Sequence, residues 1–307
     1  MTTPYRRPHL IAALLSAAVV TLTGCASSQN QTDPDNTTST APQRIAAISP
    51  DVAEAVATLG GGDRLVLIPG TQTNPALTNH LPVMQSVTTT LAAHGAADPE
   101  QILATRPDLA IITPRHEGES DTTALLEASS VPVLTLPNSW QTGEQMLNNI
   151  TLIGDAIGTP DQAAELVREI SDAFEAIEPL TGPSPTVLVL SNQAGRPMVN
   201  AGDGFTLDLL TRAGGRNAAA DAGLTRTSFA DPEQIVRANP DAILLVDILG
   251  TGKDSFASVL TNPAVAELAA VQQDRIMLLG GKQTQAFGLR SAPEGLVQIR
   301  DWLADLG

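Results

Sequence analysis

One seventeen-residue pattern occurs twice in this chain and constrains the fold more than any other feature. The first copy, ADPEQILATRPDLAIIT, covers residues 97–113, and the second, ADPEQIVRANPDAILLV, covers residues 230–246. Eight of the seventeen positions are identical, and six of these are consecutive. Any strand–helix unit that begins with Asp-Pro would look somewhat alike, but six consecutive identities favour a repeated structural unit. The repeat therefore predicts two lobes built on a similar plan.

Each copy is expected to form a short capped helix followed by a buried strand. Asp98 and Asp231 are suitable N-cap residues, and the proline after each suits the first helical position. Gln101 and Gln234 stand three residues after the caps, as in a capping box. The next proline in each copy ends the helix, because proline disfavours helical geometry in the residue before it. Apolar runs follow at 109–112 and 242–246 and predict strands.

The rest of the chain predicts an α/β fold with mostly parallel sheets. Apolar runs at 45–49 and 65–68 predict strands, and residues 51–59 between them predict a helix. A strand at 186–190 and a helix at 205–213 loosely mirror this unit in the second half. The fold class expected is therefore α/β, with two Rossmann-like lobes.

A helical region is expected to connect the lobes. Residues 143–157 predict one helix, and a second is expected from residue 160 to about residue 180, with one apolar face. About 20 helical residues span roughly 30 Å, which is long enough for a stiff connection. We thus expect an N-terminal lobe at 44–140, connecting helices at 141–182 and a C-terminal lobe at 183–307.

The first 25 residues are expected to be a targeting segment. Arg6 and Arg7 precede an apolar run at 10–22, which is shorter than the roughly 20 apolar residues of a membrane span. The sequence Leu-Thr-Gly before Cys25 resembles the lipobox of bacterial lipoproteins, in which the cysteine is lipidated. An ordinary signal peptide with a chance cysteine is the alternative. Residues 26–43 are polar and predict a flexible tether between membrane and folded body.

Composition excludes several classes of function. The formal net charge is −16, and cleavage before Cys25 removes two arginines and no acids, giving −16 − 2 = −18. Such a charge argues against a nucleic-acid partner. Cys25 is the single cysteine, so no disulfide or thiol chemistry is expected. The single tyrosine, Tyr5, lies in the targeting segment.

Further motifs resemble a known family. They are Arg44-Ile45, Ser49-Pro50, Ala53-Glu54, Leu59-Gly60, Asp63-Arg64 and Pro107-Asp108-Leu109. In this order they resemble the substrate-binding proteins of ABC importers for vitamin B12, ferric siderophores and haem. The likeness extends over roughly residues 44–305.

The resemblance implies a bilobal, class III periplasmic-binding-protein fold with a long backbone helix, little hinge motion and a ligand between the lobes. It implies a monomeric, lipid-anchored protein outside the cytoplasm, which delivers an iron complex to a permease and its ATPase. No intrinsic cofactor and no enzymatic activity are expected. The family docks through one acid on each lobe. Glu100 matches the first acid, whereas Thr211 stands where the second is expected, so Asp208, one turn earlier, is the nearest candidate.

Loops after the predicted strands are the candidate ligand sites, because open α/β sheets bind ligands there. Arg115 and His116 follow the first repeat directly. Histidine can ligate haem iron, and arginine can pair with a propionate. His94 is the second choice, and an ordinary surface loop is the alternative reading of these side chains. The other candidates from such loops are Gln72, Arg196 and Arg290, with Lys253 and Lys282 as further cations.

Aromatic content bears on the ligand. Aromatic residues make up 3% of the chain, and we expect Trp140 and Trp302 to lie away from the cleft. Thr113 stands where vitamin B12 binders of the family carry an aromatic residue, so a corrinoid ligand is disfavoured. Phe205, Phe256 and Phe287 could each contribute, although isolated phenylalanines usually belong to the core.

Three alternatives remain. A zinc- or manganese-binding lipoprotein could use His80, His94 and His116, although their spacing defines no ligand set. An extracytoplasmic enzyme is disfavoured, because the sequence contains no HExxH or GxSxG motif. The third is a scaffold lipoprotein without an importer.

Overall fold

The computed structural model describes residues 41–306, apart from 93–96, 114–118 and 193–194. The predicted targeting segment and nearly all of the predicted tether lie outside the described residues. Within the described part of the chain, no helix is both long enough and apolar enough to cross a membrane. Residues 41–307 form one compact unit.

The N-terminal lobe is built on a five-stranded parallel sheet with the strand order β3-β2-β1-β4-β5. Its strands are β1 (Ile45–Ala47), β2 (Leu65–Pro69), β3 (Thr90–Leu91), β4 (Leu109–Ile112) and β5 (Val133–Thr135). Its helices and short helical turns, the latter labelled η, are α1 (Pro50–Val56), η1 (Ala57–Gly61), η2 (Gly62–Arg64), η3 (Gly70–Thr73), α2 (Leu81–Ser86), α3 (Pro99–Ala104) and α4 (Glu119–Ala128). The parallel order agrees with the strand–helix–strand pattern of the sequence.

The C-terminal lobe has a six-stranded mixed sheet. Its strands are β6 (Thr186–Ser191), β7 (Met198–Val199), β8 (Arg216–Asn217), β9 (Ser228–Phe229), β10 (Ala242–Asp247) and β11 (Ile276–Gly280). The order is β11-β10-β6-β7-β9, with β8 beside β6. The mostly parallel prediction holds for β6, β10 and β11, whereas β7 runs antiparallel to both β6 and β9.

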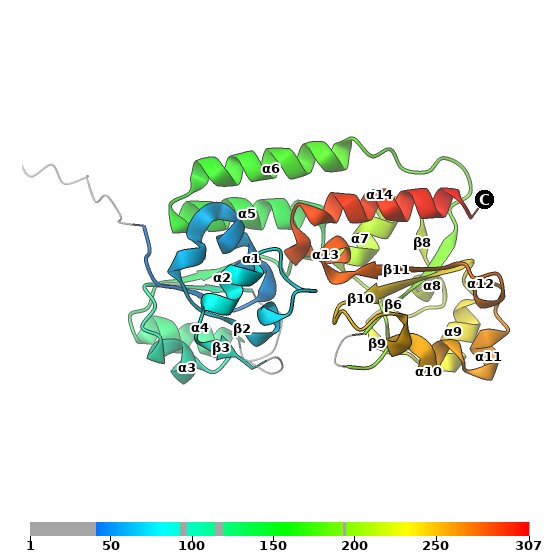
Figure 1. The fold of residues 1–307 in the computed structure, drawn as a ribbon, viewed down its shortest axis with the longest axis horizontal. Coiled ribbons are helices and arrows are strands. Elements are labelled where there is room, and N and C mark those ends of the chain that lie inside the picture. Colours follow the sequence, from blue (N-terminus) through cyan, green and yellow to red (C-terminus); the bar gives the residue numbers. More distant parts are fainter. Residues whose placement is uncertain (1–40, 93–96, 114–118, 193–194, 307) are drawn as a thin grey trace, which may run out of the picture. The chain divides into compact units, whose positions relative to one another are not determined.

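Helices and short helical turns pack around the C-terminal sheet, and α14 is the longest of them (Figure 1). They are α7 (Phe205–Arg212), α8 (Ala218–Asp221), α9 (Pro232–Ala238), η5 (Lys253–Phe256), α10 (Ala257–Leu260), α11 (Pro263–Ala266), α12 (Ala269–Gln272), α13 (Gly281–Thr284), η6 (Ala286–Gly288) and α14 (Ser291–Ala304).

Two packed helices connect the lobes, α5 (Gly143–Ile157) and α6 (Pro160–Glu175). The bounds predicted for the first are confirmed. The second is shorter than predicted: its 16 residues span about 24 Å at 1.5 Å per residue. Pro179 explains the difference, because it disfavours helical geometry at Glu178. The connection is therefore a two-helix layer, in which α5 packs on α1 of one lobe and α7 of the other.

The repeated pattern folds as predicted into α3–β4 and α9–β10. The carboxylates of Asp98 and Asp231 accept hydrogen bonds from the second residue after each cap, both at 2.9 Å. The predicted capping boxes are wrong in detail. The Gln101 side chain donates to the backbone oxygen of Thr90 instead, and Gln234 Oε1 is buried without a partner among the described residues.

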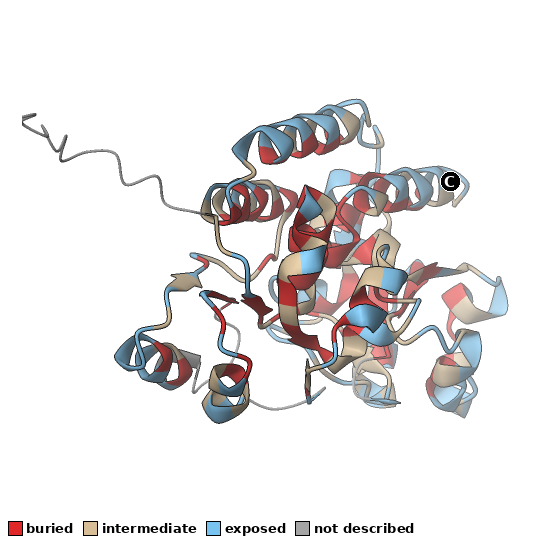
Figure 2. Cartoon of the chain, turned by 60° about the vertical axis from the view of Figure 1, so that its left-hand side comes forward, coloured by how far each residue is buried: buried red, intermediate tan, exposed pale blue. Residues whose placement is uncertain are grey.

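The largest cluster of buried apolar residues belongs to both lobes. It contains Ile45 and Val52 from the first lobe, Ile150 from α5, and Val187 and Leu296 from the second lobe. Figure 2 shows buried residues on the strands and on one face of the helices, with exposed residues on the opposite face. The two lobes thus share a core.

Candidate ligand-binding site

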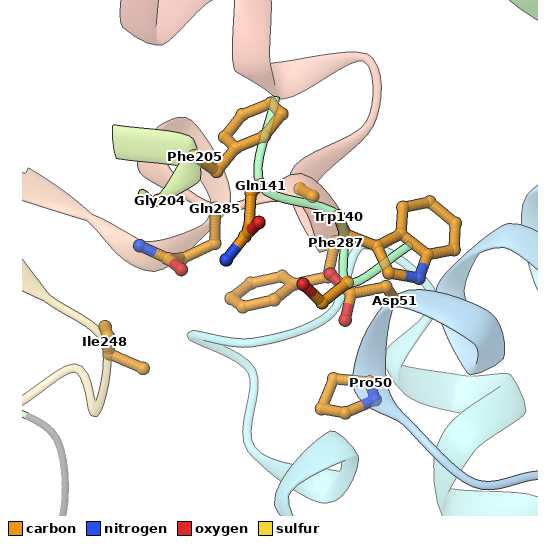
Figure 3. A pocket seen from close by; sticks show the side chains of 11 residues that line it. Pro50, Asp51, Trp140, Gln141, Gly204, Phe205, Ile248, Gln285 and Phe287 are labelled. Atoms are coloured by element: carbon orange, nitrogen blue, oxygen red, sulfur yellow. The ribbon is translucent and has the colours of Figure 1, made fainter. Parts of the chain in front are cut away.

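A cavity of about 270 Å³ lies between the two lobes. Four of the segments that line it follow the carboxyl ends of β1, β5, β10 and β11, which is where open α/β sheets bind ligands. The lining residues are Pro50, Asp51, Ser139, Trp140, Gln141, Gly204, Phe205, Ile248, Gln285, Ala286 and Phe287 (Figure 3). Residues 139–141, called here the connecting segment, precede α5 and line the cavity together with residues of both lobes.

Trp140 is one of the residues that line the cavity. The prediction that it lies elsewhere is wrong, because it lines the cavity while only 2% of its surface is exposed. Its indole Nε1 donates to Thr113 Oγ1 at 3.1 Å. Thr113 in turn lies 3.0 Å from Ser49 Oγ, the residue that caps α1. The indole ring of Trp140, from the loop after β5, thus contacts Thr113. By the resemblance, Thr113 stands where vitamin B12 binders of the family carry an aromatic residue.

The opposite wall is aromatic and aliphatic. Phe205 begins α7 and Phe287 lies in η6, and both line the cavity with Ile248. A side chain at Gly281 would place its Cβ 3.1 Å from the Phe287 ring, so the glycine leaves room for that ring. The predicted contribution of Phe205 and Phe287 is consistent with this placement, whereas Phe256 is fully buried in the core of the second lobe.

Two carboxamides line the cavity, Gln141 from the connecting segment and Gln285 from the second lobe (Figure 3). Gln285 Nε2 donates to Thr206 Oγ1 at 2.9 Å. Asp51 carries the single formal charge among the lining residues named above. This described lining therefore offers aromatic surface and neutral polar groups.

The loop after β10 is organised by a buried carboxylate that sequence reasoning missed. Asp247 Oδ1 accepts from Asn192 Nδ2 at 2.6 Å and from the backbone N–H of Thr251 at 3.0 Å. Its Oδ2 accepts from the backbone N–H of Gly252 at 2.7 Å. The sequence signal that could have indicated this arrangement was an aspartate followed by two glycines in the loop, Gly250 and Gly252. These bonds fix the loop that carries Ile248 into the cavity.

Most of the predicted ligand residues stand apart from this lining. Gln72 is fully buried, and its Nε2 donates to the backbone oxygen of Pro50 at 2.8 Å. Arg196 stacks on the half-exposed Phe229, with its guanidinium carbon 3.7 Å from the ring centre. Arg290 pairs with Glu169 of α6 at 2.9 Å. His94, Arg115 and His116 lie outside the described residues, and Cys25 does too.

The predicted docking acids differ in their surroundings. Glu100 is exposed in the first turn of α3. Asp208 accepts a hydrogen bond from the backbone N–H of Gly143 at 2.9 Å and pairs with Arg212 at 2.8 Å. Its side chain is 19% exposed. The carboxylate of Asp208 therefore caps α5 and joins it to α7.

Histidine and acidic side chains do not gather into a metal site in the described part of the chain. No group of three or more such side chains could hold an ion there. His80, one of the histidines considered for zinc or manganese, lies 3.0 Å from Thr58 Oγ1. Burial lowers the pKa of His80, and the positive charge of Arg290 acts in the same direction.

Two α/β lobes with a shared core, joined by two helices and enclosing an aromatic cavity, define a bilobal solute-binding protein. Residues 45–282 match the family model described as periplasmic binding protein, and the chain belongs to this family. The proteins that this chain resembles are solute-binding proteins and not enzymes. The predicted fold class and family are thereby confirmed.

Individual relatives agree with this assignment. The chain is 26% identical over 270 residues to an uncharacterized ABC transporter substrate-binding lipoprotein, YvrC, of Bacillus subtilis (strain 168), covering 79% of this chain and 81% of the relative. Two solved structures share the fold with TM-scores of 0.68, each covering 86% of this chain and 98% of the other. They are the periplasmic haem-binding protein RhuT of Roseiflexus sp. RS-1, 24% identical, and the periplasmic vitamin B12 binding protein BtuF of Vibrio cholerae, 19% identical.

Proposed function

We propose that this protein binds an iron complex, haem or a ferric siderophore, outside the cytoplasm and delivers it to an ABC importer. The observation that carries the proposal is the aromatic cavity between the lobes. Trp140, Phe205 and Phe287 line it together with the polar side chains of Gln141 and Gln285, and such a mixed lining is typical of small-molecule sites. The haem-binding neighbour supports the choice of ligand class.

A corrinoid is the second candidate. The sequence argument against it assumed that Trp140 lies away from the cleft, whereas Trp140 lines the cavity. The carboxamides of Gln141 and Gln285 could also pair with the amide side chains of a corrinoid. The vitamin B12 binding neighbour is consistent with this alternative.

Three further predictions stay proposals. His116 remains the candidate axial ligand to haem iron, with His94 as second choice. Arg115 remains the candidate partner of an anionic group. Lipidation of Cys25 would hold the protein at the membrane, as the word lipoprotein in the relative's name suggests.

For docking to the permease we propose Glu100 and Glu233. These residues occupy the same position in the two copies of the repeat, and both are exposed. Asp208 is less suitable, because Gly143 and Arg212 already engage its carboxylate. A symmetric pair of acids would present one negative group on each lobe to arginines of the permease.

Trp140 supplies a probe for the ligand. The chain contains two tryptophans, so W302F in residues 26–307 leaves Trp140 as the single one. We expect haemin or a ferric hydroxamate to quench its fluorescence saturably at one equivalent, and F287A to weaken binding. With haemin, H116A should also change the Soret band if His116 ligates iron.

The outcomes separate the candidates. Saturable quenching by cyanocobalamin alone would select the corrinoid reading, and no quenching by any of these compounds would overturn the proposal. F229A serves as the matched phenylalanine deletion outside the cavity. If F229A weakens binding as much as F287A, the ligand extends to Arg196, which stacks on that ring.

A further inference from the structure

Glu54 is a buried acid that the cavity does not use. It lies on α1 with none of its surface exposed. Its Oε2 accepts from Thr78 Oγ1 and its Oε1 from the backbone N–H of Asn79, both at 2.7 Å. Burial raises the pKa of Glu54, although these hydrogen bonds and the charge of Lys282 act in the opposite direction. Burying a carboxylate is costly unless it is bonded in this way, so its position calls for a role.

The partners of Glu54 belong to a stretch that touches both lobes, residues 74–80, called here the 74–80 segment. The segment follows η3 in the first lobe. Asn74 Nδ2 donates to the backbone oxygen of Leu249 at 3.1 Å, and Asn79 Nδ2 donates to that of Gly288 at 3.2 Å. Both acceptors belong to the second lobe. The segment is thus tied across the boundary between the lobes.

A lysine of the second lobe holds the same segment from the other side. Lys282 Nζ, in α13, donates to the backbone oxygen of Thr78 at 3.4 Å. Thr78 therefore receives a contact from Lys282 on its carbonyl and offers its hydroxyl to Glu54. The segment therefore lies between the ammonium group of Lys282, from the second lobe, and the carboxylate of Glu54, from the first lobe.

Close packing restricts the segment further. A Cβ on Gly250 would lie 2.7 Å from the Cβ of Ala76, and one on Gly281 would lie 3.5 Å from a methyl carbon of Leu77. The second lobe therefore presents glycines where the 74–80 segment approaches. The absence of a Cβ at Gly250 thus allows the backbone of the second lobe to pack closely against Ala76.

The contact between Gly281 and the 74–80 segment adjoins the cavity. The Cβ position of Gly281 lies 3.1 Å from the Phe287 ring and 3.4 Å from the Cα of Ile248. Phe287 and Ile248 both line the cavity. The same contact that orders the 74–80 segment therefore supports two side chains of the second-lobe wall.

We infer that Glu54 is a positioning residue: with Lys282 it clamps the 74–80 segment as a fulcrum between the lobes and sets the distance between the two cavity walls. Relative movement of the lobes is then a small rotation about this point. The inference does not depend on which ligand the cavity accepts, so it can be tested without one.

The test measures the distance between the lobes by electron spin resonance. Residues 26–307 contain no cysteine, so spin labels can be attached at E127C and Q273C, both exposed and on different lobes. We expect E54L to broaden the distance distribution and to speed hydrogen exchange at the Asn79 amide about tenfold or more, as for a lost charge-assisted hydrogen bond. E54Q, which keeps the shape and one acceptor, should restore most of the wild-type behaviour.

D241N is the matched control, because Asp241 accepts two similar bonds from Thr186 within one lobe, at 2.8 and 2.7 Å. We expect D241N to lower stability and leave the inter-lobe distances unchanged. A wild-type distribution in folded E54L would overturn the inference. If E54L does not fold, K282M decides: it removes the second-lobe side of the clamp and should broaden the distribution, and an unchanged distribution in K282M contradicts the proposal.

Discussion

At the scale of single residues, Asp247 illustrates a carboxylate whose charge stabilises the fold. Burial by itself raises the pKa of Asp247, but hydrogen bonds from the backbone N–H groups of Gly252 and Thr251 and from Asn192 outweigh it. The pKa of Asp247 is therefore held below its ordinary value. Because the folded protein favours the charged form, the carboxylate contributes stability above the unfolded pKa of about 3.9.

We expect D247N to lower the free energy of unfolding by about 1–3 kcal/mol at pH 7, because an NH₂ group would face a backbone N–H. The contribution of Asp247 is lost as the pH falls through its folded pKa, so the difference from wild type should shrink below about pH 4. Urea unfolding at several pH values measures this. D254N, at an exposed acid nearby, should change stability by less than about 0.5 kcal/mol. A D247N effect that stays constant between pH 7 and pH 3 would contradict the assignment.

Trp140 marks the limit of prediction at this scale. Its place in the cavity depends on a left-handed backbone conformation, with φ of 62°, and on a hydrogen bond to Thr113, 27 positions earlier. Neither has a local sequence signal, because non-glycine residues seldom adopt this conformation. Asp98 and Asp231 could be predicted as caps, since a cap contacts its own helix.

At the scale of secondary-structure elements, the approach of α5 to α6 depends on one glycine. An added Cβ on Gly154 would lie 2.3 Å from the Cβ of Ala163. Real Cβ atoms do not come so close, so α5 and α6 would have to separate. The small residues at both positions therefore set the spacing of the connecting layer.

The sign of the change in stability caused by G154A tests this spacing. Helix propensity alone would stabilise the variant by about 1 kcal/mol, whereas overpacking should destabilise it by about 1–3 kcal/mol. We expect destabilisation in urea unfolding. T151A, on the exposed side of α5, should stay within about 0.5 kcal/mol of wild type. A more stable G154A would show that α6 adjusts freely.

Strands and helices were the most predictable part of the chain at this scale. The bounds of α5 and β4 agree with the expected ranges, because hydrophobic periodicity and turn residues act locally. The antiparallel β7 was not predicted, since a two-residue strand carries no periodic signal. The capping glutamines were predicted wrongly, because Gln101 found a partner on β3.

At the scale of the whole molecule, the repeat places equivalent acids on both lobes. If Glu100 and Glu233 dock to the permease, E100K and E233K should each weaken association with the reconstituted permease about tenfold or more, through charge repulsion. Ligand binding, followed by Trp140 fluorescence, should stay unchanged. Association can be measured with the permease in lipid nanodiscs.

D254N is the control for general loss of negative charge on the second lobe and should leave association nearly unchanged. D208N tests the alternative acid. If D208N weakens docking in a folded protein while E233K does not, the second-lobe contact returns to Asp208. If neither E100K nor E233K alters association, the proposal of paired docking acids is wrong.

The sequence alone determined the two-lobe α/β plan, the family and the class of binding protein. The plan follows from local signals, namely helix caps, apolar periodicity and a pattern that is repeated in each lobe, whereas the family and the class follow from motifs that resemble those of known binding proteins. Only the tertiary structure decided which side chains meet in the cavity and which link the lobes. Trp140 with Thr113, and Glu54 with Thr78 and Lys282, are distant in the sequence. Such pairs form because packing a shared core brings separate loops together, and no local pattern records which loops will meet.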